Sequence, residues 1–101
     1  MRSDTMTDYS LEIERLKESR CYSDNIIKLQ EECGELTQAV AKEYFRGTPE
    51  TRQHVIEEMV DVRICMDILC KELHITDAEL VDMRHHKMLR NLMRIEGDID
   101  G

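Results

Sequence analysis

The segment Arg46-Gly47-Thr48-Pro49-Glu50 is the sharpest break in the sequence, and it decides the fold. Gly47 is a helix stop, because glycine adopts the left-handed backbone conformation that ends helices at low cost. Thr48 and Pro49 suit the N-cap and the first helical position, and Glu50 places negative charge in the first turn. A connection this short makes the flanking helices antiparallel neighbours. The segment therefore predicts a helical hairpin in the middle of the chain.

Capping signals outside this hairpin place the other helix ends. Ser23-Asp24 is a good N-cap start, Thr76 and Glu79 have the spacing of a capping box, and Gly97 is a second stop. These signals predict an all-α fold. The expected helices cover about 10–20, 24–46, 49–73 and 77–95.

Length and composition limit what this fold can do. The 101 residues suffice for one domain, expected over 10–96 with flexible ends at 1–9 and 97–101. Only four Gly and one Pro argue against a β-sandwich or barrel, and the net charge of −8 argues against binding a nucleic-acid polymer. The apolar runs are too short to cross a membrane, and the first residues lack a secretory h-region.

The four cysteines include no C-x-x-C pair, which favours a reduced, cytoplasmic protein. A zinc site that draws on cysteines and histidines stays open, although no ligand spacing supports it.

The apolar faces predict how the helices pack. The second and fourth helices each have one apolar stripe at steps of three and four. The third has apolar residues on two sides, with Ile64 and Ile68 opposite its main stripe. One copy of so small a domain can hardly cover both sides, so we expect a homodimer or homotetramer that buries the second side. The three stripes are Ile26, Leu29, Cys33, Leu36 and Val40; Val55, Met59, Val62, Met66, Leu69 and Leu73; and Val81, His85, Met88, Leu92 and Ile95.

Acidic residues gather at two places equally far from the turn. Glu32 and Glu35 lie about 12 to 15 residues before it, and Glu58 and Asp61 lie a similar distance after it. In an antiparallel hairpin the two pairs come to the same height, beside core positions. Carboxylates so close must bind protons or cations, and hard oxygen ligands suit Mg²⁺, with Mn²⁺ able to take its place. The alternative is a solvated acidic face, the common meaning of Glu-rich helices.

A basic stripe on the last predicted helix complements these acids. Arg84, Lys87, Asn91 and Arg94 recur at steps of three and four. Lysine and arginine donate charge-assisted hydrogen bonds to phosphate, and asparagine can bind a base or sugar. The alternative here is a solvated basic face.

The two acidic motifs together resemble a known family. Glu31-Glu32-x-x-Glu35 followed by Glu58-x-x-Asp61 is similar to the E-E-x-x-E…E-x-x-D signature of the all-α nucleoside triphosphate pyrophosphohydrolases. The segment Lys87-x-x-x-Asn91-x-x-Arg94 resembles an element in the last helix of MazG-like members. The similarity covers roughly 23–94. It implies a four-helix MazG-like bundle that oligomerises and hydrolyses a nucleoside triphosphate to the monophosphate and pyrophosphate, as in nucleotide-pool house-cleaning.

The resemblance also implies roles for particular residues. Glu32, Glu35, Glu58 and Asp61 would be Mg²⁺ ligands. Glu31 would orient or deprotonate the attacking water or support the ligands, and Glu35 would share in catalysis. The substrate-binding residues would be Lys42, Lys87, Asn91 and Arg94.

Several alternatives stay open. The chain could be a phosphoribosyl-ATP pyrophosphatase or a dUTPase-type relative, because the sequence does not identify the base or sugar. A helical oligomer could bind nucleotide or metal without turnover, and a plain interaction protein could carry surface acids. Tyr44 and Phe45 could stack on a base, although aromatic residues near a helix end more often pack.

Overall fold

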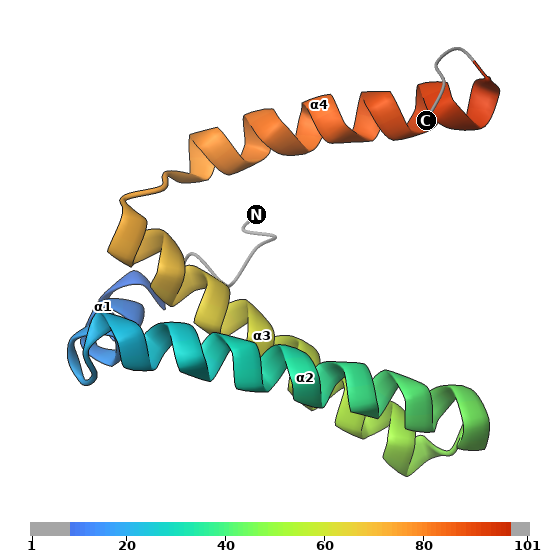
Figure 1. The fold of residues 1–101 in the computed structure, drawn as a ribbon, viewed down its shortest axis with the longest axis horizontal. Helices are drawn as coiled ribbons and strands as arrows, with labels where there is room; N and C mark the ends of the chain where they lie inside the picture. The colour runs from blue at the N-terminus through green and yellow to red at the C-terminus, as the bar shows by residue number, and fades with distance from the viewer. Residues whose placement is uncertain (1–8, 98–101) are drawn as a thin grey trace.

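Four helices make up the computed structural model, which describes residues 9–97. They are α1 (Ser10–Glu18), α2 (Tyr22–Arg46), α3 (Pro49–Leu73) and α4 (Asp77–Glu96), and no strand occurs within 9–97. The all-α prediction is confirmed (Figure 1). None of these helices is apolar over a length that would cross a bilayer. The predicted flexible ends, 1–9 and 97–101, fall almost wholly outside the described residues.

The central hairpin forms as its capping residues predict. Gly47 has φ 61° and donates its N–H to the Glu43 carbonyl at 2.8 Å. The Thr48 hydroxyl accepts from the Thr51 N–H at 3.1 Å, and the Thr51 hydroxyl accepts from the Thr48 N–H at 2.9 Å. The Thr51 hydroxyl also donates to Glu43 at 2.6 Å, which links the ends of α2 and α3. The turn is therefore closed from both helices, and α2 and α3 lie antiparallel over their length (Figure 1).

The start of α2 differs from the prediction. The helix begins at Tyr22, with Cys21 as an N-cap that makes no side-chain capping bond. Ser23 was expected to cap it, but Ser23 lies inside the first turn, with its hydroxyl 3.3 Å from the Cys21 sulfur. The first helix is also shorter than expected, because Ser19 ends α1 by binding the Leu16 carbonyl with both its N–H and its hydroxyl.

The first helix covers the side of α3 that was expected to need a second copy. Helix α1 packs on α3, where Ile13 and Ile68 are buried and Ile64 is half-buried. A second copy is therefore not needed to cover Ile68, whereas oligomerisation itself stays a prediction. Helix α1, which gave only a weak apolar pattern, supplies the cover within one chain.

The face that α2 turns to α3 is rotated from the predicted stripe. Its buried residues are Asn25, Glu32 and Ala39, spaced by seven residues as in a coiled-coil seam. Cys33 and Val40 of the predicted stripe are exposed. The contact with α3 therefore includes two polar side chains, Asn25 and Glu32, where the sequence pattern predicted apolar ones. The apolar residues Cys33 and Val40 stay exposed in one chain.

Helix α4 projects away from the other three helices, so one chain does not form the four-helix bundle by itself (Figure 1). None of its residues is buried. A short elbow sets its direction. His74 has φ 57°, Ile75 donates its N–H to the Cys70 carbonyl at 2.9 Å, and Thr76 forms the predicted capping box with Glu79. Each elbow residue is held by capping geometry, which orients α4 as a separate arm.

Asn25 joins three helices, and its loss should lower stability. Its side-chain amide donates to Glu72 on α3 at 2.9 Å and to the Lys17 carbonyl in the last turn of α1 at 3.3 Å. We expect Asn25→Ala to lower the free energy of unfolding by about 1–3 kcal/mol, because buried polar partners lose their donor. Urea denaturation would measure this loss. Gln30→Ala, an exposed change on the same helix, is the control; equal stability of the two variants would contradict the prediction.

Candidate metal centre

Two carboxylates lie in the middle of the α2–α3 seam. Glu32 is 5% exposed and Glu58 is 8% exposed, and each belongs to the buried face of its own helix. The hairpin brings them together because they lie at similar distances from Gly47 on antiparallel helices. Acids are rarely so buried unless a partner or an ion compensates their charge.

A third carboxylate joins them from the surface. One oxygen each from Glu32, Glu58 and Asp61 lies within 4.8 Å of the others. Asp61 is exposed, so the group has two buried members and one that faces solvent. An ion could therefore enter from the Asp61 side and contact both helices.

In each buried acid, one carboxylate oxygen contacts a side-chain nitrogen and the other contacts none. The Lys28 ammonium lies 2.9 Å from Oε2 of Glu32, and Nε2 of His54 lies 3.1 Å from Oε2 of Glu58. The other oxygen of each acid, Oε1, is buried and has no hydrogen-bond partner among the residues that the structure describes. A buried acceptor without a partner loses the free energy of its contact with water. These two oxygens are thus free to bind a cation.

The pKa values of the two acids move in opposite directions. The hydrogen bond from Lys28 is the main reason that the pKa of Glu32 is lowered, against the effect of burial. Burial raises the pKa of Glu58, and the charges of Glu35, Glu32 and Asp61 raise it further, with partial compensation by His54. Glu58 is therefore the acid whose ionised form most needs added positive charge.

These residues fit the metal that the sequence predicts. All the donors of the group are carboxylate oxygens, which Mg²⁺ and Mn²⁺ prefer, and an open side leaves room for water or a phosphate on the ion. The two buried oxygens without partners are the strongest sign of fit, because a cation would compensate both.

A cavity of about 270 Å³ lies beside this group, between α1, α2 and α3. Lys28, Glu32 and Asp61 line one part of it, and Arg20 adds a second cation. The apolar lining consists of Leu16, Ile64, Cys65 and Ile68. The cavity thus combines cations for an anionic group, acids for a metal ion, and an apolar surface.

The remaining predicted acids lie near the group, but not in it. Glu35 is exposed, and its charge contributes to the raised pKa of Glu58. Glu31 is also exposed, and its charge contributes to the raised pKa of Lys28. Glu35 therefore lies at the edge of the centre, and Glu31 lies near Lys28.

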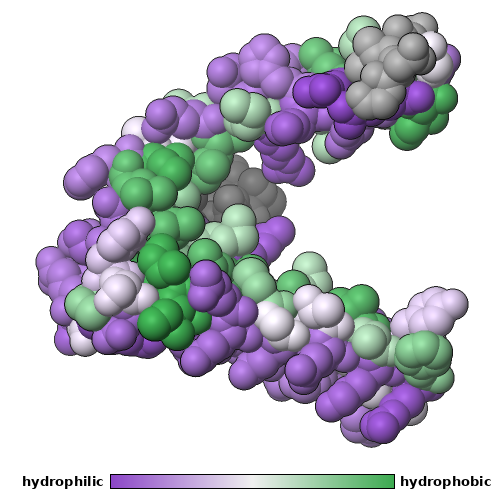
Figure 2. Space-filling view, viewed as in Figure 1, coloured by the Kyte–Doolittle hydropathy of each residue, from purple (hydrophilic) through white to green (hydrophobic). Residues whose placement is uncertain are grey.

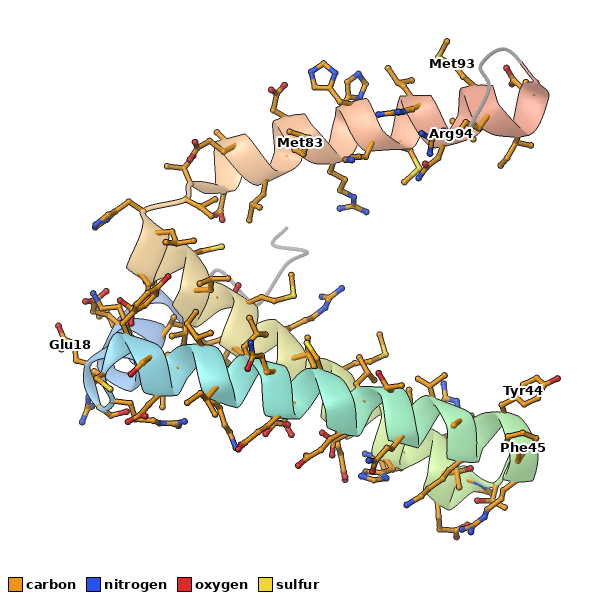
Figure 3. All side chains as sticks on the ribbon, viewed as in Figure 1. Glu18, Tyr44, Phe45, Met83, Met93 and Arg94 are labelled. Carbon is orange, nitrogen blue, oxygen red and sulfur yellow. The ribbon has the colours of Figure 1, made fainter. Side chains whose placement is uncertain are left out.

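The predicted substrate-binding residues do not meet the acids within one chain. Lys42 is exposed on α2, roughly 15 Å along the helix from Glu32. Lys87, Asn91 and Arg94 lie on α4, the separate arm, and Figure 3 shows Arg94 away from α2 and α3. Tyr44 and Phe45 lie at the far end of α2 and pack edge to face on each other, with ring centroids 5.1 Å apart (Figure 3).

The sequence pattern assigned none of Arg20, Lys28 and His54 to the site. A signal for two of them was present, because Lys28 and His54 each lie four residues before a buried acid, the spacing of side chains that meet on a helix. Arg20 comes from the connection between α1 and α2, whose position no local pattern predicts.

Comparison of the whole chain with protein-family models, curated proteins and solved structures finds no match.

Proposed function

We propose that this protein hydrolyses a nucleoside triphosphate to the monophosphate and pyrophosphate with the help of Mg²⁺. The observation that carries the proposal is the pair of buried oxygens without partners, Oε1 of Glu32 and Oε1 of Glu58, beside the exposed Asp61. A bound ion would neutralise phosphate charge and lower the pKa of a water molecule.

Different residues of the chain would bind the ion, accept the proton and bind the substrate. Glu32, Glu58 and Asp61 would hold the ion, with Glu35 at its edge. Glu35 or Glu31, both exposed, would accept the proton of the attacking water. Arg20, which lines the adjacent cavity, would bind a phosphate oxygen, and the apolar lining around Ile64 would exclude water from one side of the substrate.

A panel of ribo- and deoxynucleoside triphosphates, dUTP and phosphoribosyl-ATP tests this function. We expect Mg²⁺-dependent release of pyrophosphate and the monophosphate from at least one of them. Chromatography of both products would distinguish this cleavage from release of inorganic phosphate. Folded protein that shows no turnover above background with any substrate would contradict the enzymatic function. Nucleotide binding without turnover would favour the non-catalytic alternative.

We also propose that two or more copies associate through the apolar side of α3 next to α4. Met59 and Met66 are 46% and 52% exposed there, in a groove of about 550 Å³ that Leu36, Val62 and Leu80 also line. Hydrophobic surface gathers around the elbow and along the inner side of the α2–α3 arm (Figure 2). This face is distinct from the side of Ile64 and Ile68 that α1 covers.

The size of the uncovered surface supports a second copy as the occupant. The chain exposes 8150 Å², whereas a compact monomer of 11.9 kDa exposes about 6,000 Å². Its radius of gyration is 16.5 Å, against about 13 Å for a compact domain of this length. The excess of about 2,000 Å² is comparable to the share that one protomer buries in an obligate homodimer.

A further inference from the structure

We infer that Lys28 and His54 are a matched pair of positioning residues for the metal centre. Each holds Oε2 of its acid, Glu32 or Glu58, so that Oε1 of that acid is left to bind the metal ion. The inference rests on the proposed metal centre and adds to it two residues outside the acidic motifs. It does not depend on which substrate the centre acts on.

The two contacts repeat the same local geometry on different helices. Lys28 precedes Glu32 by four residues, and His54 precedes Glu58 by four, so each donor lies one helical turn before its acid. In both pairs the donor approaches Oε2 and leaves Oε1 buried without a partner. One such contact on a single helix would carry little weight. Here both acids of the seam have one oxygen in contact with a donor and one buried oxygen without a partner.

The antiparallel hairpin places these donors at opposite ends of the acid pair. On α2 the direction toward Lys28 leads to α1, and on α3 the direction toward His54 leads to the Gly47 turn. The two carboxylates are therefore contacted from opposite ends of the seam, and Oε1 of each is buried without a hydrogen-bond partner within residues 9–97.

A donor on one oxygen fixes the orientation of the whole carboxylate. The terminal torsion of a glutamate is broad, so an unheld carboxylate rotates among many orientations. Holding Oε2 stops this rotation before an ion arrives, which removes an entropic cost from metal binding. Polar partners of metal ligands commonly contribute 10–100-fold to metal affinity through this effect.

The donors lie nearer the surface than the acids they contact. The side chains of Lys28 and His54 are 41% and 45% exposed, whereas those of Glu32 and Glu58 are 7% and 10% exposed. The donors thus reach inward from the surface and present one N–H group each to a buried oxygen.

The test is the affinity for Mn²⁺ alone, measured by calorimetry and by electron paramagnetic resonance without nucleotide. We expect His54→Ala to weaken Mn²⁺ binding roughly 10–100-fold, and His54→Gln, which keeps a donor, to restore most of it. Lys28→Met should weaken binding to a similar degree, and Lys28→Arg should retain it. Circular dichroism without metal would establish that each variant is folded.

Matched controls come from pairs of the same kind elsewhere in the chain. His86 lies 4.0 Å from Asp82, four residues earlier on α4, and Lys17 pairs with Glu14 on α1 at 3.0 Å. His86→Ala and Lys17→Met should leave Mn²⁺ affinity unchanged, because neither acid belongs to the carboxylate group.

The outcomes separate this inference from the proposed function. Wild-type protein that does not bind Mn²⁺ would overturn the metal centre and the inference together. Wild-type binding that His54→Ala and Lys28→Met leave unchanged would overturn only the positioning roles. Loss of binding in His54→Ala with rescue by His54→Gln would support them, even if no nucleotide is hydrolysed.

Discussion

Glu58→Gln is expected to remove the response of the protein to Mg²⁺ and, without metal at neutral pH, to make the fold more stable. Glutamine has nearly the same shape, so it keeps the seam filled and can still accept from His54. It removes the charge that burial and the neighbouring acids disfavour. In the wild type, Mg²⁺ at 100 times its dissociation constant should raise Tm by roughly 10 °C or more. The variant should show no such shift and should lose catalytic turnover.

The pH dependence of this effect has a definite sign. Because the pKa of Glu58 is raised in the folded state, the folded chain keeps that proton at pH values where the unfolded chain has lost it. Metal-free wild-type protein should therefore lose stability as the pH rises from the ordinary carboxyl range through the raised pKa. Glu58→Gln should lack this decline, whereas Glu57→Gln, an exposed neighbour, should keep it. Thermal unfolding in chelator over a pH series would measure the difference, and parallel curves for all three proteins would contradict it.

Met66→Asp is expected to convert an oligomer into a monomer of 11.9 kDa. The side chain is half exposed in one chain, so the aspartate stays solvated there, but a second copy on this face would bury its charge. We expect the dissociation constant of the oligomer to rise roughly 100-fold or more. Light scattering at micromolar concentration would measure this change. Leu11→Asp, on the exposed side of α1, is the control. A wild-type protein that is already monomeric would contradict the proposed interface.

Much of the fold could be predicted because helix ends depend on local chemistry. Gly47, Thr48 and Pro49 determine the turn through their own backbone and hydroxyl groups, and Thr76 does the same for α4. The bounds of α3 match the prediction for this reason. The start of α2 did not, because Cys21 ends the preceding connection with an extended backbone and makes no capping bond that a sequence pattern could reveal.

Packing between helices was harder to predict, because it depends on which neighbour is present. The apolar pattern of α2 favoured Cys33 and Val40, yet the contact with α3 is formed around Glu32 and Ala39. Ile68 was expected to face another copy, but α1 covers it. A periodic pattern identifies an apolar face and gives no information about the element that covers it.

The acids of the site could be predicted, and most of their partners could not. Glu32, Glu58 and Asp61 meet as expected, because distance from one turn determines their height in the hairpin. The division of each carboxylate between a protein donor and a free oxygen depends on side-chain orientation, which spacing alone does not define. The basic residues of α4 were expected beside the acids, and their separation follows from the elbow.

The elbow also amplifies small rotations into large displacements of the C-terminal end of α4. Twenty residues of helix extend about 30 Å beyond their last firm attachment, so a rotation of only about 10° near Ile75 would displace the Glu96 end by about 5 Å. Small differences in backbone angle at three residues thus become large differences in where a cationic helix tip lies. The position of the C-terminal end of α4 therefore depends on how firmly the elbow at 74–76 is held.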